Sequence, residues 1–212
     1  MPLRNRVTPF GDIIATEARG LLFGNRGVLH DENGRLVRKW QVRRWIACRL
    51  EFKGRRRPLL RPGRFTELFF LDEATALAAG HRPCAECRRE DFVRFRDAWL
   101  DTHPGASTRV DDIDRTLHSE RADAGGGKCL HEAELSDLPG GSMILEQDRA
   151  WIVLGDELLA WSPFGYSKTR PMPAPRVVRV LTPPSMIDVI RAGYVPAVHP
   201  TAALSKRTEV GT

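Results

Sequence analysis

The sequence Pro83-Cys84-Ala85-Glu86-Cys87 constrains the fold of this chain more than any other feature. Two cysteines separated by two residues at the start of a helix can place both sulfurs on one metal ion. The helix N-terminus and the neighbouring arginines favour the thiolate form that binds metals. Four cysteines in 212 residues are too few for a disulfide scaffold. We therefore expect a metal site, with Zn²⁺ as the cofactor, around which the neighbouring segments fold.

A closed zinc site needs four ligands, and the chain has two further cysteines to supply them. Cys48 lies in residues 41–52, where apolar and polar side chains alternate as in a strand. Cys129 lies in a glycine-rich segment, and we predict that it completes the set Cys48, Cys84, Cys87 and Cys129. The alternatives for the fourth position are His81, His118 and His131. Two unconnected core thiols, or a redox pair without its usual βαβ surroundings, would explain the Cys-x-x-Cys less well.

Basic side chains are concentrated in one segment. Residues 35–64 contain twelve Lys and Arg and a single acid, Glu51, so they carry +11, and the other 182 residues carry −5 of the net +6. Arginine-rich segments favour phosphate, because the guanidinium fork matches its oxygens and binding releases counterions. A solvated basic face, or a general bias toward Arg, is the plainer explanation. The residues predicted to contact nucleic acid are Arg43, Arg44, Lys53, Arg55, Arg56, Arg57, Arg61, Arg64, Arg82, Arg88 and Arg89.

Patterns along the chain predict an α+β fold, in which a small zinc-stabilised α/β module joins a β-rich C-terminal half. Asn33-Gly34 predicts a hairpin turn, and Asp72 and Gly80 predict the two ends of a short helix. Predicted strands cover 28–30, 35–37, 41–52, 65–71, 143–146, 150–154, 157–161 and 177–181. Predicted helices cover 72–79, 90–100, 113–120 and 183–192, the last capped by Thr182. Loops are expected at 53–64 and 163–175.

We expect four regions along the chain. A basic zinc-binding half covers 1–100 and begins with an irregular arm at 1–26. An acidic and glycine-rich connection follows at 101–130. A β-rich half covers 131–199, and a frayed tail covers 200–212. No apolar run reaches the ~20 residues that a membrane helix needs, and no apolar signal segment follows the N-terminus. We therefore expect a cytoplasmic protein with no membrane partner.

The segment from Phe65 to Arg88 resembles the zinc-binding domain of the Ada DNA-repair protein. An aromatic strand, a short Glu-Ala-rich helix ending in Gly80, an Arg-Pro pair and both cysteines fall in register, and the resemblance covers about residues 45–90. It implies a four-thiolate zinc site on a small α/β module that grips DNA phosphates. In that family one zinc-bound cysteine also accepts a methyl group from a phosphotriester.

This chain departs from the family at the first ligand pair. The family supplies those ligands as Cys-x-x-x-Cys, whereas here Phe52 stands four residues after Cys48. Cys48, Cys84 and Cys87 therefore carry over as ligands, and the fourth must come from elsewhere. Alkyl transfer would require that fourth ligand to be a thiolate as well, because a Cys/His mixture lowers the reactivity of the bound sulfur.

The sequence leaves three alternative functions open, two of them enzymatic. His30-Asp31-Glu32 with Pro83-Cys84-x-x-Cys87 matches the zinc-deaminase signature, although Asn33-Gly34 predicts a turn where a deaminase needs a helix. A nuclease-like hydrolase would use the polar cluster of Asp111, Asp112, Asp114, His118, Glu120 and His131, which is also what an acidic surface linker looks like. The third possibility is an adaptor for an acidic protein. Contact with DNA, in repair or processing, is the function we expect.

Overall fold

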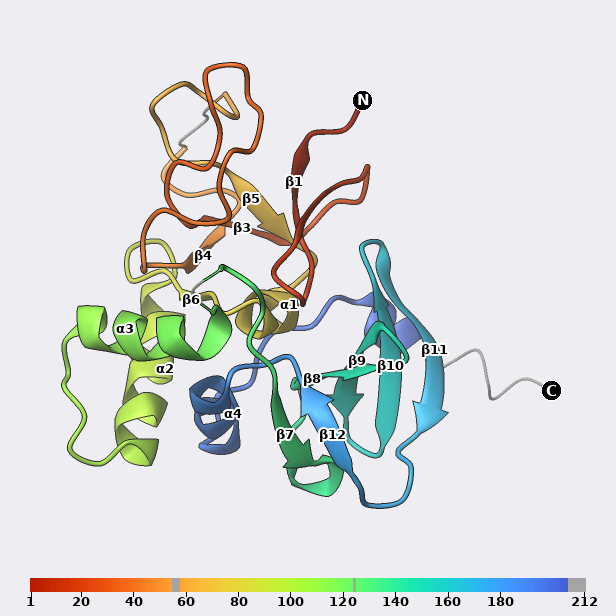
Figure 1. Ribbon diagram of the computed structural model, residues 1–212. Helices are drawn as coiled ribbons and strands as arrows, with labels where there is room; N and C mark the ends of the chain where they lie inside the picture. The colour runs from red at the N-terminus through yellow and green to blue at the C-terminus, as the bar shows by residue number, and fades with distance from the viewer. Residues whose placement is uncertain (55–57, 124, 206–212) are drawn as a thin grey trace.

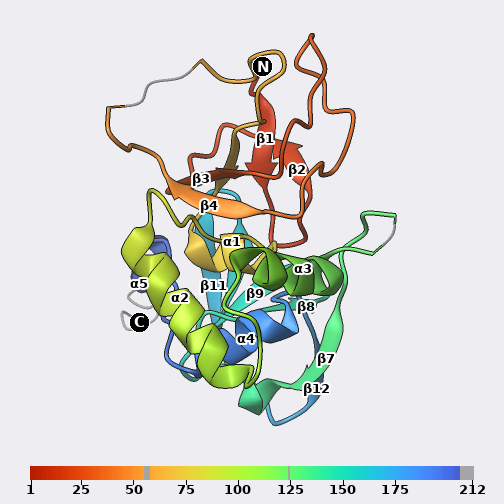
Figure 2. The same ribbon diagram turned by 90° about the vertical axis from the view of Figure 1, so that its left-hand side faces the viewer.

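The computed structural model describes residues 1–54, 58–123 and 125–205, and its architecture is α+β, as predicted. Two sheets are stacked one above the other with a short helix between them, and further helices cover one side of the stack (Figures 1 and 2). Within the described ranges, no helix combines the length and the apolar character needed to cross a bilayer. The predicted nucleic-acid residues Arg55, Arg56 and Arg57 lie outside the described residues.

The first sheet is built from strands between Arg4 and Pro83, in the order β2-β1-β5-β3-β4-β6. Two of its pairings are parallel, β1 with β5 and β4 with β6, and both join segments far apart in the sequence. Its strands are β1 (Arg4–Val7), β2 (Ile13–Ala15), β3 (Leu22–Asn25), β4 (Ile46–Arg49), β5 (Leu68–Phe70) and β6 (Arg82–Pro83).

The second sheet is an antiparallel sheet built from the C-terminal half, in the order β11-β10-β9-β8-β12-β7. Its central strands are the most apolar segments of the chain, which explains their burial. Its strands are β7 (His131–Glu134), β8 (Met143–Glu146), β9 (Arg149–Leu154), β10 (Glu157–Ser162), β11 (Gly165–Pro171) and β12 (Val177–Val180), and a 3-10 turn, Leu135–Asp137, follows β7.

The helix α1 (Glu73–Ala78) lies between the two sheets, and all six of its residues are buried. Ala74 and Ala78 pack in the core of the second sheet, and Ala76 in the core of the first. Small side chains allow two sheets to approach the same helix from different sides. The predicted ends of this helix are confirmed. The Asp72 carboxylate accepts the Thr75 backbone N–H at 2.8 Å, and Gly80 has a φ of +86°.

Two acidic residues at the start of α1 join it to the end of the chain. The Asp72 carboxylate also accepts hydrogen bonds from the Tyr166 hydroxyl at 2.7 Å and the His199 backbone N–H at 2.9 Å. The Glu73 carboxylate accepts from the Tyr194 hydroxyl at 2.5 Å and the Ala197 N–H at 3.1 Å. These bonds hold residues 194–199 against α1, so the C-terminal segment is part of the central core.

Three longer helices cover one side of the stack (Figure 2). Their shared core is mostly aromatic and aliphatic and includes Trp99, Leu117 and Val189, with Leu77 of α1. The helices are α2 (Arg89–Thr102), α3 (Val110–Arg121) and α4 (Pro184–Arg191), and a short α5 (Thr201–Ser205) packs beside β11. The connection expected at 101–130 therefore contains α3, which buries Ile113 and Leu117 in this core.

Several predicted elements are confirmed, and others differ in extent. The Asn33-Gly34 turn closes a bridge between His30 and Leu36, and the three strands between 143 and 161 lie where predicted. The strand predicted at 41–52 is reduced to β4. The Thr182 hydroxyl does not cap α4, because it accepts the Met143 N–H at 2.9 Å instead. Of the tail expected at 200–212, residues 201–205 form α5.

The prediction that two segments are irregular is wrong. The arm at 1–26 contains β1, β2 and β3, and the loop at 163–175 contains β11. Both segments are rich in Arg, Gly or Pro, so neither shows the alternation that marks a strand. They become strands because partners elsewhere in the chain supply the backbone hydrogen bonds. Those partners are β5 for the N-terminal strand and β10 for β11.

Candidate metal centre

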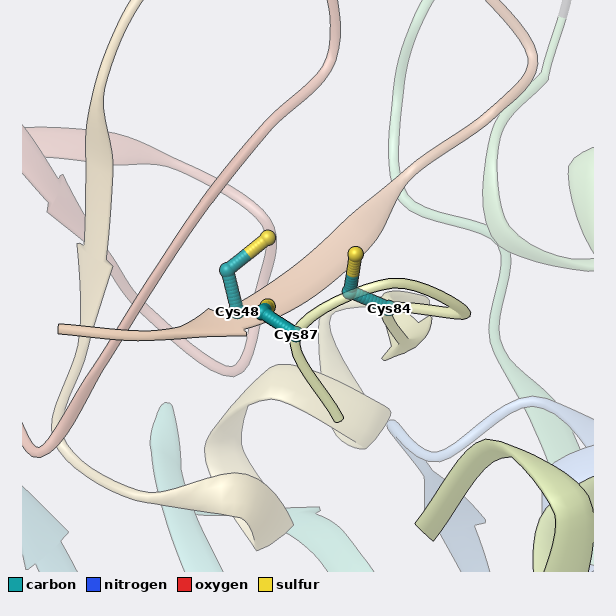
Figure 3. Close-up of side chains that lie close together, drawn as sticks. All are labelled: Cys48, Cys84 and Cys87. Atoms are coloured by element: carbon teal, nitrogen blue, oxygen red, sulfur yellow. The ribbon is translucent and has the colours of Figure 1, made fainter. Parts of the chain in front are cut away.

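Three cysteines converge at one edge of the first sheet. Cys48 lies on β4, and Cys84 and Cys87 lie in the turn between β6 and α2 (Figure 3). Their sulfur atoms all lie within 4.8 Å of one another. The three residues are 5%, 8% and 8% exposed, respectively. Three sulfurs at this spacing could hold a single metal ion.

The backbone around the cluster fixes the positions of the sulfurs. Strand β6 pairs in parallel with β4, with Ala47 opposite Pro83, and the Cys84 N–H donates to the Ala47 carbonyl at 2.9 Å. The Arg88 N–H then donates to the Cys84 carbonyl at 3.1 Å, which forms a helical turn leading into α2. Proline suits β6 because it occupies a short edge strand, where a missing N–H is tolerated.

Hydrogen bonds place the negative charge of the cluster on Cys84. Bonds from the Cys48 and Cys87 thiols lower the pKa of Cys84 to about 2, and the backbone N–H groups of Cys87 and Glu86 act in the same direction. The bond to Cys84, with burial, raises the pKa of Cys48. For Cys87 the bond with Cys48 lowers the pKa, but the bond with Cys84 and burial outweigh it, so the pKa is raised. A metal ion would displace the two shared protons.

A cleft of about 230 Å³ opens beside the three sulfurs. Its walls are mainly aromatic and aliphatic, and Glu67, which is 6% exposed, and Glu86 are its acids. The Glu67 carboxylate accepts the Leu60 backbone N–H at 2.9 Å, so it also anchors the loop that forms one wall. The lining residues are Phe23, Asn25, Ile46, Cys48, Arg49, Leu50, Phe52, Leu59, Phe65, Glu67, Phe69, Cys84, Glu86 and Cys87.

The donor set indicates which metals the cluster suits. Three thiolates favour soft or borderline ions such as Zn²⁺, and a tetrahedral ion held by three sulfurs would have one further position for a ligand. Among the residues that the structure describes, no fourth His, Cys, Asp or Glu belongs to the group. The fourth corner would therefore face the cleft, where water or another small ligand could enter.

The prediction that Cys129 completes the set is corrected. Cys129 follows α3 and leads into β7 of the second sheet, and its N–H donates to the Arg121 carbonyl at 3.4 Å, outside the cluster. The three histidines considered for the same position are placed elsewhere. His81 accepts from Arg26 in the interior, His118 packs on the Trp40 ring, and His131 pairs with Val180 on β7.

The predicted nucleic-acid residues divide into two groups. Arg82 and Arg88 are 1% and 5% exposed, and they form ion pairs with Asp114 and Glu73, at 2.8 and 2.7 Å. These two assignments are wrong, because neither guanidinium can reach a polyanion. The exposed members are Arg43, Arg44, Lys53, Arg61, Arg64 and Arg89. Arg49 is exposed and lines the cleft, but it is absent from the predicted set. Its position next to Cys48 in the sequence could have indicated that it belongs to this site.

The residues of the two alternative active sites are not assembled. Asp114 is bound to Arg82, the Glu120 carboxylate accepts from the Ser185 hydroxyl, and His131 is part of β7. The His30 ring contacts the Thr66 hydroxyl at 2.6 Å, and Glu32 is exposed. Neither set forms a metal-binding group within the described part of the chain.

No family model, curated protein or solved structure matches this chain.

Proposed function

We propose that this protein binds Zn²⁺ at the three-cysteine cluster and contacts nucleic acid, DNA in the first place, through the Arg-rich segment, in DNA repair or processing. One observation carries the proposal. The strand that holds Cys48 continues into the basic loop, and Arg49 lines the cleft beside the sulfurs. A metal that joins Cys48 to the α2 turn would therefore fix the base of a phosphate-binding surface.

Where the structure describes it, the loop is anchored through its backbone, which leaves three of its basic side chains exposed. Glu67 accepts the Leu60 N–H, and the His30 ring contacts the Arg61 carbonyl at 3.2 Å. Lys53, Arg61 and Arg64 are exposed. Cations held on an ordered backbone can meet several phosphates with less loss of conformational entropy than cations on a free chain. The resemblance of residues 45–90 to the Ada zinc-binding domain supports DNA as the polyanion.

Salt dependence tests this proposal. We expect the metal-loaded protein to bind a short DNA duplex with an affinity that falls steeply as salt rises, by about 0.9 in log K per log salt for each phosphate contacted. Arg61→Glu with Arg64→Glu should weaken binding and reduce the slope by about 2. The measurement is fluorescence anisotropy over a series of salt concentrations, with a single-stranded RNA of the same length for comparison.

The matched control reverses two exposed arginines of the second sheet, Arg149 and Arg179. The net charge changes by the same amount, so a general charge effect would weaken both double variants equally. Binding that is absent, independent of salt, or equally affected in both variants would contradict the DNA proposal and favour an adaptor for an acidic protein.

A catalytic metal is the second candidate, because three thiols border a cleft that could admit a fourth ligand. Three protein ligands and an open position are typical of catalytic rather than structural zinc. If the position is open, imidazole added to the Co²⁺-substituted protein should change its visible absorption bands. An unchanged spectrum would show that the position is closed, and it would leave a structural metal as the remaining role.

A further inference from the structure

A second cleft, of about 520 Å³, lies between the first sheet and the end of α3, and most of its charged residues are basic. Among the described residues that line it, the single acid is Asp12, which is exposed. Six bases line it: Arg4, Arg26, Arg38, Lys39, Arg121 and Lys128. A cavity of this size lined by five arginines and lysines with one acid, and by Lys128, whose pKa burial lowers to about 7, is typical of a site for an anion.

The two arginines in the floor of this cleft are almost completely buried. Arg26 and Arg121 are each 2% exposed, and their guanidinium carbons lie 4.1 and 4.3 Å from the centre of the same Trp45 ring. Arg26 donates to His81 at 3.1 Å and to the Gly11 carbonyl at 3.0 Å. Arg121 donates to the carbonyls of Gly80 and Arg43. The described carboxylates form no ion pair with either.

Each buried guanidinium also has a nitrogen without a partner. Nη2 of Arg26 and Nε of Arg121 are inaccessible to solvent and have no hydrogen-bond partner among the described residues. Gly11 lines the cleft, and a Cβ built on it would lie 3.9 Å from Nη2 of Arg26. This nitrogen therefore lies directly behind the lining of the cleft. Buried charges are normally paired, and an unsatisfied charged donor destabilises the fold.

Burial lowers the pKa of Arg26 and of Arg121 to about 9. The positive charges of Arg26 and Arg82 lower the pKa of Arg121 further. The neighbouring acids, Asp12 for Arg26 and Asp114 with Glu120 for Arg121, offset only part of this effect. An anion in the cleft would supply the missing negative charge.

We propose that this cleft binds the phosphate group of a nucleotide-sized ligand, with Arg38 and Lys39 at the rim as its hydrogen-bond donors and Arg26 and Arg121 as the positive charges beneath it. The guanidinium fork matches phosphate oxygens, and phosphate can accept from several donors at once. The site is separate from the cysteine cluster. Ala47 and Cys48 are consecutive on β4 and belong to different core clusters, and the cleft borders Trp45 rather than the sulfurs. The proposal therefore does not depend on a metal at the cysteines, although Arg38 and Lys39 belong to the Arg-rich segment 35–64.

The first test uses inorganic phosphate as the probe on the metal-loaded full chain. At a phosphate concentration ten times the dissociation constant, we expect the midpoint of thermal unfolding to rise by about 3 to 6 °C above that in a chloride buffer of equal ionic strength. Titration calorimetry gives the dissociation constant. No rise above the chloride control, together with no binding heat, would overturn the proposal.

Rim variants keep the test independent of folding, because the side chains of Arg38 and Lys39 are exposed. Arg38→Glu with Lys39→Glu should weaken phosphate binding at least tenfold, whereas Arg149→Glu with Arg179→Glu should leave it unchanged. Equal affinity in the rim variant and the wild-type protein would assign phosphate to another surface and overturn the proposal.

The source of the phosphate is distinguished by competing ligands. Adenosine 5′-monophosphate is compared with a tetranucleotide that carries either a 5′-phosphate or a 5′-hydroxyl. Tightest binding of the mononucleotide would identify a free nucleotide, and tightest binding of the phosphorylated tetranucleotide would identify a nucleic-acid end. Equal binding of the two tetranucleotides, with no competition by inorganic phosphate, would contradict a phosphate site.

Discussion

Replacing Cys84 or Cys87 with serine should reduce the bound metal from about one Zn²⁺ per chain to almost none, and the first sheet should lose its ordered edge. The three sulfurs join β4 to the turn before α2, and among the described residues no further ligand is close enough to replace a lost thiolate. Metal binding in structural zinc sites contributes on the order of 10 kcal/mol, which is comparable with the whole stability of a domain.

Elemental analysis of the purified protein measures the metal, and circular dichroism during chelation and reloading measures the fold. Cys129→Ser is the matched control, because it removes a half-buried cysteine that lies outside the cluster. We expect this variant to keep its metal and its unfolding midpoint. A metal-free protein that keeps the same spectrum and midpoint as the loaded protein would contradict a structural metal at this site.

The second large effect is expected at the buried ion pair between Arg82 and Asp114. The two side chains are 2% and 3% exposed, and two parallel hydrogen bonds of 2.9 and 2.8 Å join them. The pair connects β6 to α3 two residues before Cys84. We expect Asp114→Asn to lower the free energy of unfolding by about 3–5 kcal/mol, because it leaves the Arg82 charge buried without a counter-ion.

Chemical denaturation of the metal-loaded protein measures this loss. Asp112→Asn removes a half-buried partner of Arg115 on the same helix. The Asp112 side chain is 31% exposed, so water screens the pair and the midpoint should change little. The double variant Arg82→Met with Asp114→Leu should recover much of the stability, since it buries no unpaired charge. A loss no larger for Asp114→Asn than for Asp112→Asn would contradict a structural role for the buried pair.

The local signals in the sequence were sufficient for α1 and for part of the metal centre. Asp72 and Gly80 define the ends of a helix through hydrogen bonds and backbone angles that depend on neighbouring residues alone. Cys84 and Cys87 are close together because only two residues separate them. Cys48 joins them through the parallel pairing of β4 with β6, and its residue type and the resemblance to the Ada domain had both indicated it as a ligand.

The errors concern contacts between distant segments. The sequence places Arg82 and Arg88 among other cations, but their partners Asp114 and Glu73 lie 32 and 15 residues away. Cys129 is a plausible ligand by residue type, yet the chain carries it toward the second sheet. The unpaired Arg26 and Arg121 have no local pattern either, because they are brought together on Trp45 only when β3 and α3 pack on the same strand.

The position of α1 has a consequence for how the chain is synthesised. Ala76 completes the core of the first sheet, whereas Ala74 and Ala78 need the side chains of β8, β9 and β10 for cover. While residues 143–202 are still inside the ribosome, the emerged N-terminal part exposes this apolar helix face and lacks the partners of Asp72 and Glu73. We therefore expect the two sheets to fold as one cooperative unit, and only once residues 143–202 are available to cover α1.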